Sequence, residues 1–242
     1  MLVLTKKDLL FWGVMSFAVI LSIITPISLS SPKLQETIGG DMIYRQIIID
    51  AGHGEPDGGA VSSDGVKESD LNLEIATKLE NALSSRGYDV IMTRSDKNNI
   101  SGLNEDSTIK SIKSKDLTNR VNLANSSGAE FMISIHMNKY DDPKYYGWQT
   151  FYSKNSVSGE ALAKAIQEGI RKSTGLTNKR EALKIEGIKI VDKTTIPVVI
   201  VECGFLSNPD ECAKLQNEDY QNQIVDGICV GIDSYLSLRG QS

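Results

Sequence analysis

The chain has 242 residues and a formal net charge of −5. That length allows one sizeable domain with an accessory segment, or two small domains. Because the charge is negative and shows no basic excess, the composition argues against nucleic acid as a partner. The three cysteines, Cys203, Cys212 and Cys229, cannot all pair within one chain, and their apolar surroundings favour buried thiols. A bridge between Cys203 and Cys212 is the alternative.

The first 30 residues resemble an export segment. Lys6 and Lys7 precede a stretch, 9–32, that contains no Asp, Glu, Lys or Arg and is mostly apolar. A charged start followed by an apolar block is typical of a signal peptide, and the block approaches the roughly 20 residues that a membrane span needs. We therefore expect residues 1–30 to be a signal peptide or a membrane anchor, followed by a linker at 31–41.

The rest of the chain alternates between strand and helix patterns. Short β-branched or apolar runs predict strands at 45–50, 88–93, 131–135, 148–152 and 197–202, and a strand or hairpin at 183–191. Apolar stripes predict helices at 69–86, 116–125, 158–173 and 221–238. The polar stretch 94–115 is longer than most connections, which indicates a functional or mobile loop. Together these patterns predict one α/β domain, 42–242, whose mostly parallel sheet is flanked by helices on both faces.

The chain has only two histidines, and both follow apolar, strand-like runs. His53 comes shortly after 45–50, and His136 comes directly after 131–135. In open α/β sheets, ligands bind beyond the carboxyl ends of the strands. Two imidazoles placed there suit a catalytic zinc site that keeps one position open. A single histidine is more often structural, but two at matching strand ends, with carboxylates nearby, indicate a metal site.

Carboxylates also occur at the end of a predicted strand and at the start of a predicted helix. Glu202 ends the apolar run 198–201, where an unpaired carboxylate would be costly, and an ion pair with Lys or Arg is its structural alternative. Glu68 begins a helix, where helix electrostatics alone would favour it by under about 1 kcal/mol. A zinc hydrolase needs a third ligand and a second carboxylate that moves protons. Residue chemistry leaves the choice of ligand open among Glu55, Asp57, Asp64, Glu68, Asp70 and Glu202.

Several motifs, taken together, resemble one known family. They are 49–54 (IDAGHG), 57–60 (DGGA), 90–94 (VIMTR), 134–138 (SIHMN) and 201–208 (VECGFLSN), with Glu68 opening a helix between the second and third. In this order they resemble the zinc-dependent N-acetylmuramoyl-L-alanine amidases of the Amidase_3 family, over residues 45–238. The resemblance implies a six-stranded, largely parallel sheet and one Zn²⁺ ion bound by His53, Glu68 and His136. It also implies that Glu202 is the catalytic base.

The function implied by this resemblance is hydrolysis of the amide between N-acetylmuramic acid and L-alanine of peptidoglycan. The single catalytic domain, the apolar N-terminus and the 94–116 insertion look most like the germination-specific, CwlD-type enzymes of the spore cortex. There, removal of the peptide precedes formation of muramic-δ-lactam. The implied partners are peptidoglycan, the membrane through residues 1–30, and a regulatory or targeting protein. The implied location is outside the cytoplasmic membrane, in the forespore intermembrane space or cortex.

The chain departs from the family pattern at three positions. Ala51 replaces a common proline, Ser69 replaces a frequent lysine, and Cys203 stands where an aliphatic residue is usual. None of these changes removes an implied ligand. Because successive side chains of a strand point to opposite faces, the Cys203 thiol should face away from Glu202.

Two other functions stay open at this stage. One is a zinc peptidase that cuts within the stem peptide, since the metal chemistry is the same. The other is a non-catalytic module that binds peptidoglycan or regulates another enzyme, which would have no need for Glu202. Several polar and aromatic residues could contact substrate or serve only packing and loop bracing: Asn138, Tyr145, Tyr146, Trp148 and Arg180. Arg94 and Arg120 are expected to hold the sheet edge and a helix in place.

Overall fold

The computed structural model describes residues 36–38, 41–43, 45–103 and 106–239. The predicted export segment, 1–30, lies outside these residues. In the part of the chain that is described, no helix has the length and apolarity to cross a membrane. Two short strands, β1 (Glu36–Ile38) and β2 (Asp41–Ile43), pair antiparallel and overlap the second half of the predicted linker, 31–41. Strands of three residues leave too little alternation in the sequence to be recognised there.

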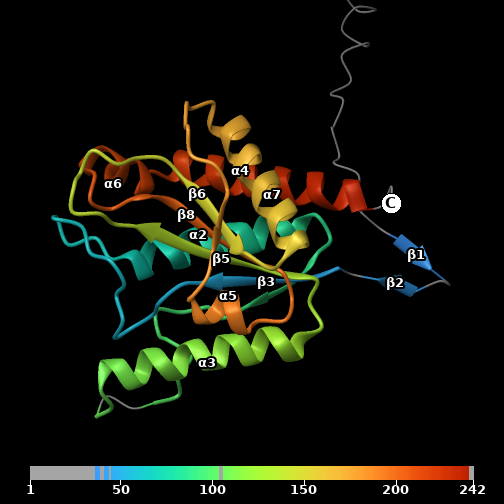
Figure 1. The fold of residues 1–242 in the computed structure, drawn as a ribbon, viewed down its shortest axis with the longest axis horizontal. Helices are drawn as coiled ribbons and strands as arrows, with labels where there is room; N and C mark the ends of the chain where they lie inside the picture. Colours follow the sequence, from blue (N-terminus) through green and yellow to red (C-terminus); the bar gives the residue numbers. More distant parts are fainter. Residues whose placement is uncertain (1–35, 39–40, 44, 104–105, 240–242) are drawn as a thin grey trace, which may run out of the picture. The chain divides into compact units, whose positions relative to one another are not determined.

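Six further strands form one sheet in the order β4–β3–β5–β8–β6–β7 (Figure 1). Their bounds are β3 (Gln46–Ala51), β4 (Asp89–Met92), β5 (Phe131–Asn138), β6 (Gln149–Ser153), β7 (Leu183–Ile185) and β8 (Val198–Phe205). The first four strands in this order are parallel, whereas β6 pairs antiparallel with β8 and parallel with β7. The mostly parallel six-stranded α/β sheet is therefore confirmed.

Helices cover both faces of the sheet (Figure 1). They are α2 (Glu68–Ser85), α3 (Ile109–Ser127), α4 (Val157–Thr174), α5 (Lys189–Lys193), α6 (Pro209–Leu215) and α7 (Glu218–Arg239). Residues of α2, α4 and α7 share a buried core with Ile47 and Ile49 of β3, while α3 and α5 share another with Ile48. Because β3 is buried on both faces, its sequence is a continuous apolar run rather than an alternating one.

Two predicted elements differ from the structure, and one helix was not predicted. Helix α3 begins at Ile109, seven residues before the predicted start, because only Ile112 is buried in the added part, 109–115, which therefore carries no apolar stripe. The predicted strand or hairpin at 183–191 ends at Ile185, after which Gly187 (φ 82°) precedes helix α5. Helix α6 was not predicted, although Asn208 accepts hydrogen bonds from its first backbone amides.

Strands β5 and β8 both extend past the predicted ends, so His136 lies within a strand rather than after it, and Glu202 lies inside β8 rather than at its end. The two residues are directly opposite in the parallel register, and an irregularity follows before Asn138 pairs with Phe205. Between these two pairs β5 advances by two residues and β8 by three. This bulge returns Phe205 to the face of the sheet that carries Glu202.

A buried ionic network joins α3 to the sheet. Arg120 is 1% exposed and forms an ion pair with Asp50 of β3, which is also 1% exposed. Asp50 accepts further hydrogen bonds from Thr93 and Ser134, and Arg120 donates to Asp116. Burial alone would raise the pKa of Asp50, but Arg120 and Ser134 hold it below its usual value.

Replacing Arg120 tests the importance of this network for stability. We expect Arg120→Met to lower the free energy of unfolding by about 3–5 kcal/mol, because Asp50 would be left as a buried charge without its partner. Lys164→Met removes an exposed ion pair with Glu160 and should leave stability unchanged. Urea denaturation of the purified variants measures both. Equal stability of Arg120→Met and the unaltered chain would contradict this assignment.

Candidate metal centre and active site

Three side chains from separate elements converge at one edge of the sheet. His53 lies in the loop after β3, Glu68 is the first residue of α2, and His136 lies in β5. Potential ligand atoms of the three lie within 4.8 Å of one another. The distance is 3.3 Å from His53 Nε2 to Glu68 Oε2 and 2.8 Å from His136 Nδ1 to Glu68 Oε1. Ligands of tetrahedral zinc are separated by about 3.3 Å, so this spacing suits a single metal ion.

Glycines make this close packing possible. A Cβ atom at Gly52 would lie 2.3 Å from His136 Nε2, so any side chain there would displace the imidazole. A Cβ atom at Gly59 would lie 2.5 Å from Glu68 Oε2, and Gly59 also has a positive φ of 68°. The two glycines of the IDAGHG and DGGA motifs therefore leave room for the two polar side chains.

The orientation of His53 is fixed by a carboxylate. Its Nδ1 donates to Asp57 Oδ2 at 2.8 Å, which leaves Nε2 facing Glu68. Asp57 in turn accepts from the Gly59 amide at 3.1 Å and forms an ion pair of 2.8 Å with Lys113. Lys113 belongs to α3, so this helix reaches the cluster through Asp57. Carboxylates that bind the second ring nitrogen of a metal-ligating histidine fix its tautomer and increase its basicity.

The electrostatics of the cluster favour positive charge. Burial would lower the pKa of His53, but its hydrogen bonds with Asp57 and Glu68 raise it to about 9. Burial likewise opposes a charged His136, yet Glu68 raises its pKa. Against its own burial, Glu68 is held well below its usual pKa by both histidines. An environment that stabilises imidazolium groups also attracts a divalent cation, which must displace their protons.

Glu202 faces this cluster and forms no ion pair with any residue that the structure describes. It lies opposite His136 in the sheet, and its buried Oε2 atom has no hydrogen-bond partner among the described residues. Burial, with a smaller contribution from Glu68, raises the pKa of Glu202 to about 7. The structural alternative, a Lys or Arg paired with Glu202, is not found in the described part of the chain. A cavity of about 140 Å³ next to the cluster is lined by residues that include His53, Asp57, Lys113, Arg120 and His136.

The other carboxylates that the sequence left as candidates lie elsewhere. Glu55 pairs with Lys67 at 2.6 Å, and Asp64 and Asp70 are exposed to solvent. Only Glu68, of the five acids between residues 55 and 70, joins both histidines. The Cys203 thiol packs in the core that α2, α4 and α7 share, as the strand alternation predicts. All three cysteines are free and buried.

Arg94 and Arg120, which were expected to hold the sheet edge and a helix in place, also hold the first loop, together with Asn72, which sequence reasoning did not identify. Arg94 Nη2 donates to the carbonyls of Gly52 (3.0 Å) and Ser69 (2.7 Å), and Asn72 Nδ2 donates to Gly52 O at 3.0 Å. Arg120 Nη2 donates to the carbonyl of His53 at 2.6 Å. The position of Asn72, four residues after Glu68 on α2, was an available signal because such residues lie on one helix face. Nothing in the spacing of the sequence pointed to the contact of Lys113 with Asp57 or to those of Arg94 with the loop carbonyls.

Comparisons with known proteins point to one family. The family model Amidase_3, described as N-acetylmuramoyl-L-alanine amidase, matches residues 47–234. The germination-specific N-acetylmuramoyl-L-alanine amidase of Bacillus subtilis (strain 168) is 37% identical over 203 residues, which are 84% of this chain and 83% of that protein.

Solved structures show the same fold. The CwlD amidase from Clostridioides difficile, in complex with the GerS lipoprotein, matches with a TM-score of 0.78 and 39% identity, over 80% of this chain and 99% of that one. An N-acetylmuramoyl-L-alanine amidase from Clostridium difficile 630 matches with a TM-score of 0.70 and 32% identity, over 80% of this chain and 97% of that one.

The contact between Asp57 and His53 predicts a weakened metal site when Asp57 is changed. We expect Asp57→Asn to lower zinc affinity about 10- to 100-fold, because the amide cannot supply the charge that orients and polarises His53. Competition with a chromophoric zinc chelator measures the affinity. Asp64→Asn, an exposed change in the same loop, is the matched control. Unchanged affinity in Asp57→Asn would show that His53 needs no such support.

The raised pKa of His53 predicts that protons are released when zinc binds. At pH 7 a group with a pKa of about 9 is mostly protonated, so each zinc ion should displace about one proton or more. Affinity should accordingly rise between pH 6 and pH 9. Isothermal titration calorimetry in buffers of different ionisation enthalpy counts the protons. Zinc binding at pH 7 without proton release would be inconsistent with the electrostatics described above.

Proposed function

The chain belongs to the Amidase_3 family of N-acetylmuramoyl-L-alanine amidases, and from this premise we propose that residues 42–242 form a zinc-dependent catalytic domain. It cleaves the amide between the lactyl group of N-acetylmuramic acid and the L-alanine of the peptidoglycan peptide. His53, Glu68 and His136 bind one zinc ion. Their mutual distances, and the glycines that make room for them, support this set.

In this proposal the zinc ion supplies Lewis acidity, which polarises the scissile carbonyl and makes the attacking water more acidic. Asp57 keeps His53 in the tautomer whose Nε2 faces Glu68. Arg120 and Arg94 hold the backbone of residues 51–53 in place. These contacts fix the ligands before substrate arrives, so little reorganisation is needed during the reaction.

Glu202 is the proposed proton carrier, and its environment is the observation that carries the proposal. Its Oε2 atom is buried near the two histidines and Glu68, the residue lacks a cationic partner among the described residues, and its pKa is about 7. A carboxyl group with a pKa near the working pH can accept a proton and later return it. Glu202 would take the proton from the attacking water and deliver it to the nitrogen of the departing L-alanine.

The biological setting is a finer part of the proposal. We infer a role in maturation of the spore cortex, where peptide removal precedes muramic-δ-lactam formation and germination depends on it. The supporting likeness is to the germination-specific amidase of B. subtilis and to the CwlD amidase whose structure contains the GerS lipoprotein. A protein partner, such as a lipoprotein, and peptidoglycan are the proposed partners. Residues 1–30 would carry the chain across the cytoplasmic membrane, as signal or anchor, into the intermembrane space or cortex of the forespore.

Mass spectrometry of muropeptides tests the reaction. Peptidoglycan incubated with the zinc-loaded chain should release intact stem peptides that begin with a free L-alanine amine. Peptides cut internally would instead indicate a zinc peptidase. Binding to glycan strands without zinc uptake would indicate a non-catalytic module.

Variants of the site test the assigned roles. Glu202→Gln should keep one zinc ion but lose at least about a hundredfold in turnover, because the amide cannot carry the proton. His53→Ala and His136→Ala should lose both zinc and activity. Glu186→Gln, an exposed change far along the chain, is the control and should match the unaltered chain. Undiminished hydrolysis by Glu202→Gln, or full zinc content in a histidine variant, would refute the corresponding role.

A further inference from the structure

A group of aromatic side chains lies beyond the carboxyl ends of β5 and β8. Tyr140, Tyr145 and Phe205 pack together, with ring centroids 5.0–6.2 Å apart. Phe205 is fully buried beneath them, whereas Tyr140 is 53% exposed and the neighbouring Tyr146 is 56% exposed. Large aromatic rings gathered on one exposed surface are more typical of a binding site than of packing.

Arg180 completes this group as a fixed cation. Its guanidinium carbon lies 4.6 Å from the centre of the Phe205 ring and 5.9 Å from that of Tyr145. Its Nε donates to Tyr146 O and its Nη1 to Gln149 Oε1, both at 2.9 Å. Two side-chain hydrogen bonds and a stacked face leave the guanidinium little freedom to lose when it binds a ligand.

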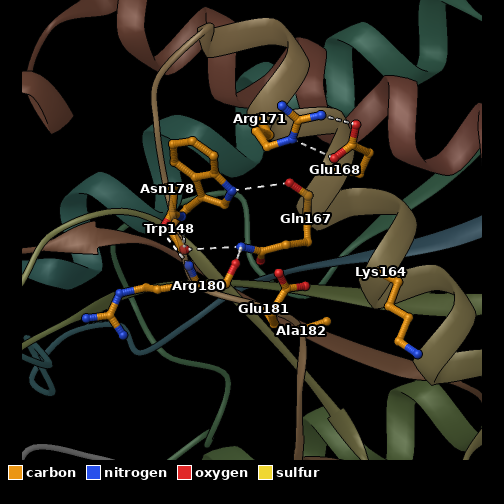
Figure 2. Close-up of a pocket in the computed structure, with 9 residues that line it drawn as sticks. All are labelled: Trp148, Lys164, Gln167, Glu168, Arg171, Asn178, Arg180, Glu181 and Ala182. Atoms are coloured by element: carbon orange, nitrogen blue, oxygen red, sulfur yellow. Dashed lines mark hydrogen bonds and ion pairs between the residues drawn. The ribbon is translucent and has the colours of Figure 1, made fainter.

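The backbone of Arg180 is also held. Gln167 Nε2 donates to the Arg180 carbonyl at 2.8 Å, and the Arg180 amide donates to Asn178 Oδ1 at 3.0 Å. Figure 2 shows that the Arg180 side chain points away from the side chains of Trp148 and Gln167. The arginine is therefore anchored on the α4 side and presents its charge on the other.

No carboxylate neutralises Arg180 within the described residues, although the chain as a whole has a net charge of −5. Its guanidinium contacts two oxygens of uncharged groups and two ring faces. The adjoining cavity of about 220 Å³ has no acidic residue in its lining, which consists of Lys144, Tyr145, Tyr146, Asn178, Lys179 and Arg180. A pocket with this lining fits an anion that also has an apolar or flat part.

The pocket is connected to the active site through the sheet. Gln149, which holds Arg180, lies opposite Glu202 in the antiparallel β6–β8 pair. Residues opposite each other in such a pair project from the same face, and the bulge in β8 brings Phe205 to that face as well. Phe205 is three residues from Glu202, at most about 10 Å along the strand. An extended peptide covers that distance with about three residues.

The chemistry of the substrate identifies the anion. In the proposed reaction the lactyl carboxyl group of muramic acid is tied up in the scissile amide, so the free carboxylates near the cleaved bond belong to the peptide. Resting on the proposed amidase function, we propose that the pocket formed by Arg180, Tyr145 and Tyr146 binds a carboxylate of the departing peptide. Arg180 is the specificity-determining contact, and it selects acidic stem peptides over neutral ones.

A pair of synthetic substrates tests this subsite. They are N-acetylmuramoyl-L-alanyl-D-glutamate with both carboxylates free, and the same compound with both converted to amides. The unaltered, zinc-loaded chain should prefer the free acid by about 10- to 100-fold in kcat/KM, as expected for a charge-assisted hydrogen bond. In Arg180→Gln the preference should disappear through a higher KM for the acid, with kcat and hydrolysis of the diamide little changed. The two mono-amides then show which carboxylate is bound.

Two variants control for indirect effects. Arg180→Lys keeps the charge but not the forked, stacked geometry, and should restore part of the preference. Lys172→Gln removes an exposed cation from α4 and should leave the preference unchanged. An equal loss on both substrates in Arg180→Gln, or no preference in the unaltered chain, would overturn the subsite but leave the amidase function standing.

Failure of the amidase function itself gives a different result. The unaltered chain would then hydrolyse neither compound, and calorimetric titration with the dipeptide L-alanyl-D-glutamate decides the subsite on its own. Binding about tenfold weaker in Arg180→Gln than in the unaltered chain would support the subsite. Equal binding by the two would overturn it.

Discussion

The buried ion pair between Asp50 and Arg120 is the interaction on which the active-site edge of this domain depends. Arg120 extends from α3 to the end of β3, where it neutralises Asp50 and donates to the carbonyls of Ala51 and His53. Arg94 reaches the same loop from the end of β4 and donates to the carbonyls of Ala51 and Gly52. Three successive carbonyls are thus held by two buried arginines. His53 can consequently remain at a φ of 60°, a conformation that a residue with a side chain rarely adopts.

With this loop fixed, the two nearby carboxylates Glu68 and Glu202 differ in pKa because their environments differ. Glu68 accepts hydrogen bonds from backbone amides and lies against both histidines, so its pKa is well below the usual range. Glu202 is only half-buried as a residue, but its Oε2 atom is enclosed and has no donor among the described residues, and its pKa is about 7. One carboxylate is therefore permanently charged, as a metal ligand should be, and the other can exchange a proton. Acid and base roles are commonly divided in this way by environment rather than by residue type.

The sequence was sufficient for the architecture and for the central side chains, because strands buried on both faces and motifs at their carboxyl ends leave clear patterns. It was insufficient where a polar side chain replaces the apolar stripe. The first turns of α3 were missed for this reason, since Ile112 is the one buried residue in the stretch 109–115. Lys113 was beyond sequence reasoning because its partner, Asp57, is distant in the chain. Arg180 was a candidate substrate contact, but its stacking on Phe205, 25 residues further along the chain, left no signal in the sequence. The bulge in β8 was equally invisible, although it determines which side chains share a face with Glu202.

The central claim is that the protein assembles the metal site before the metal binds. Hydrogen exchange of the backbone amides of residues 52–60, measured on the zinc-free and the zinc-loaded chain, tests it most directly. The amides of Gly52, Gly54, Asp57, Gly59 and Ala60 all donate to protein acceptors. They should be protected without zinc, and zinc should change their protection little. Rapid exchange that becomes slow only when zinc is added would show instead that the metal organises the loop.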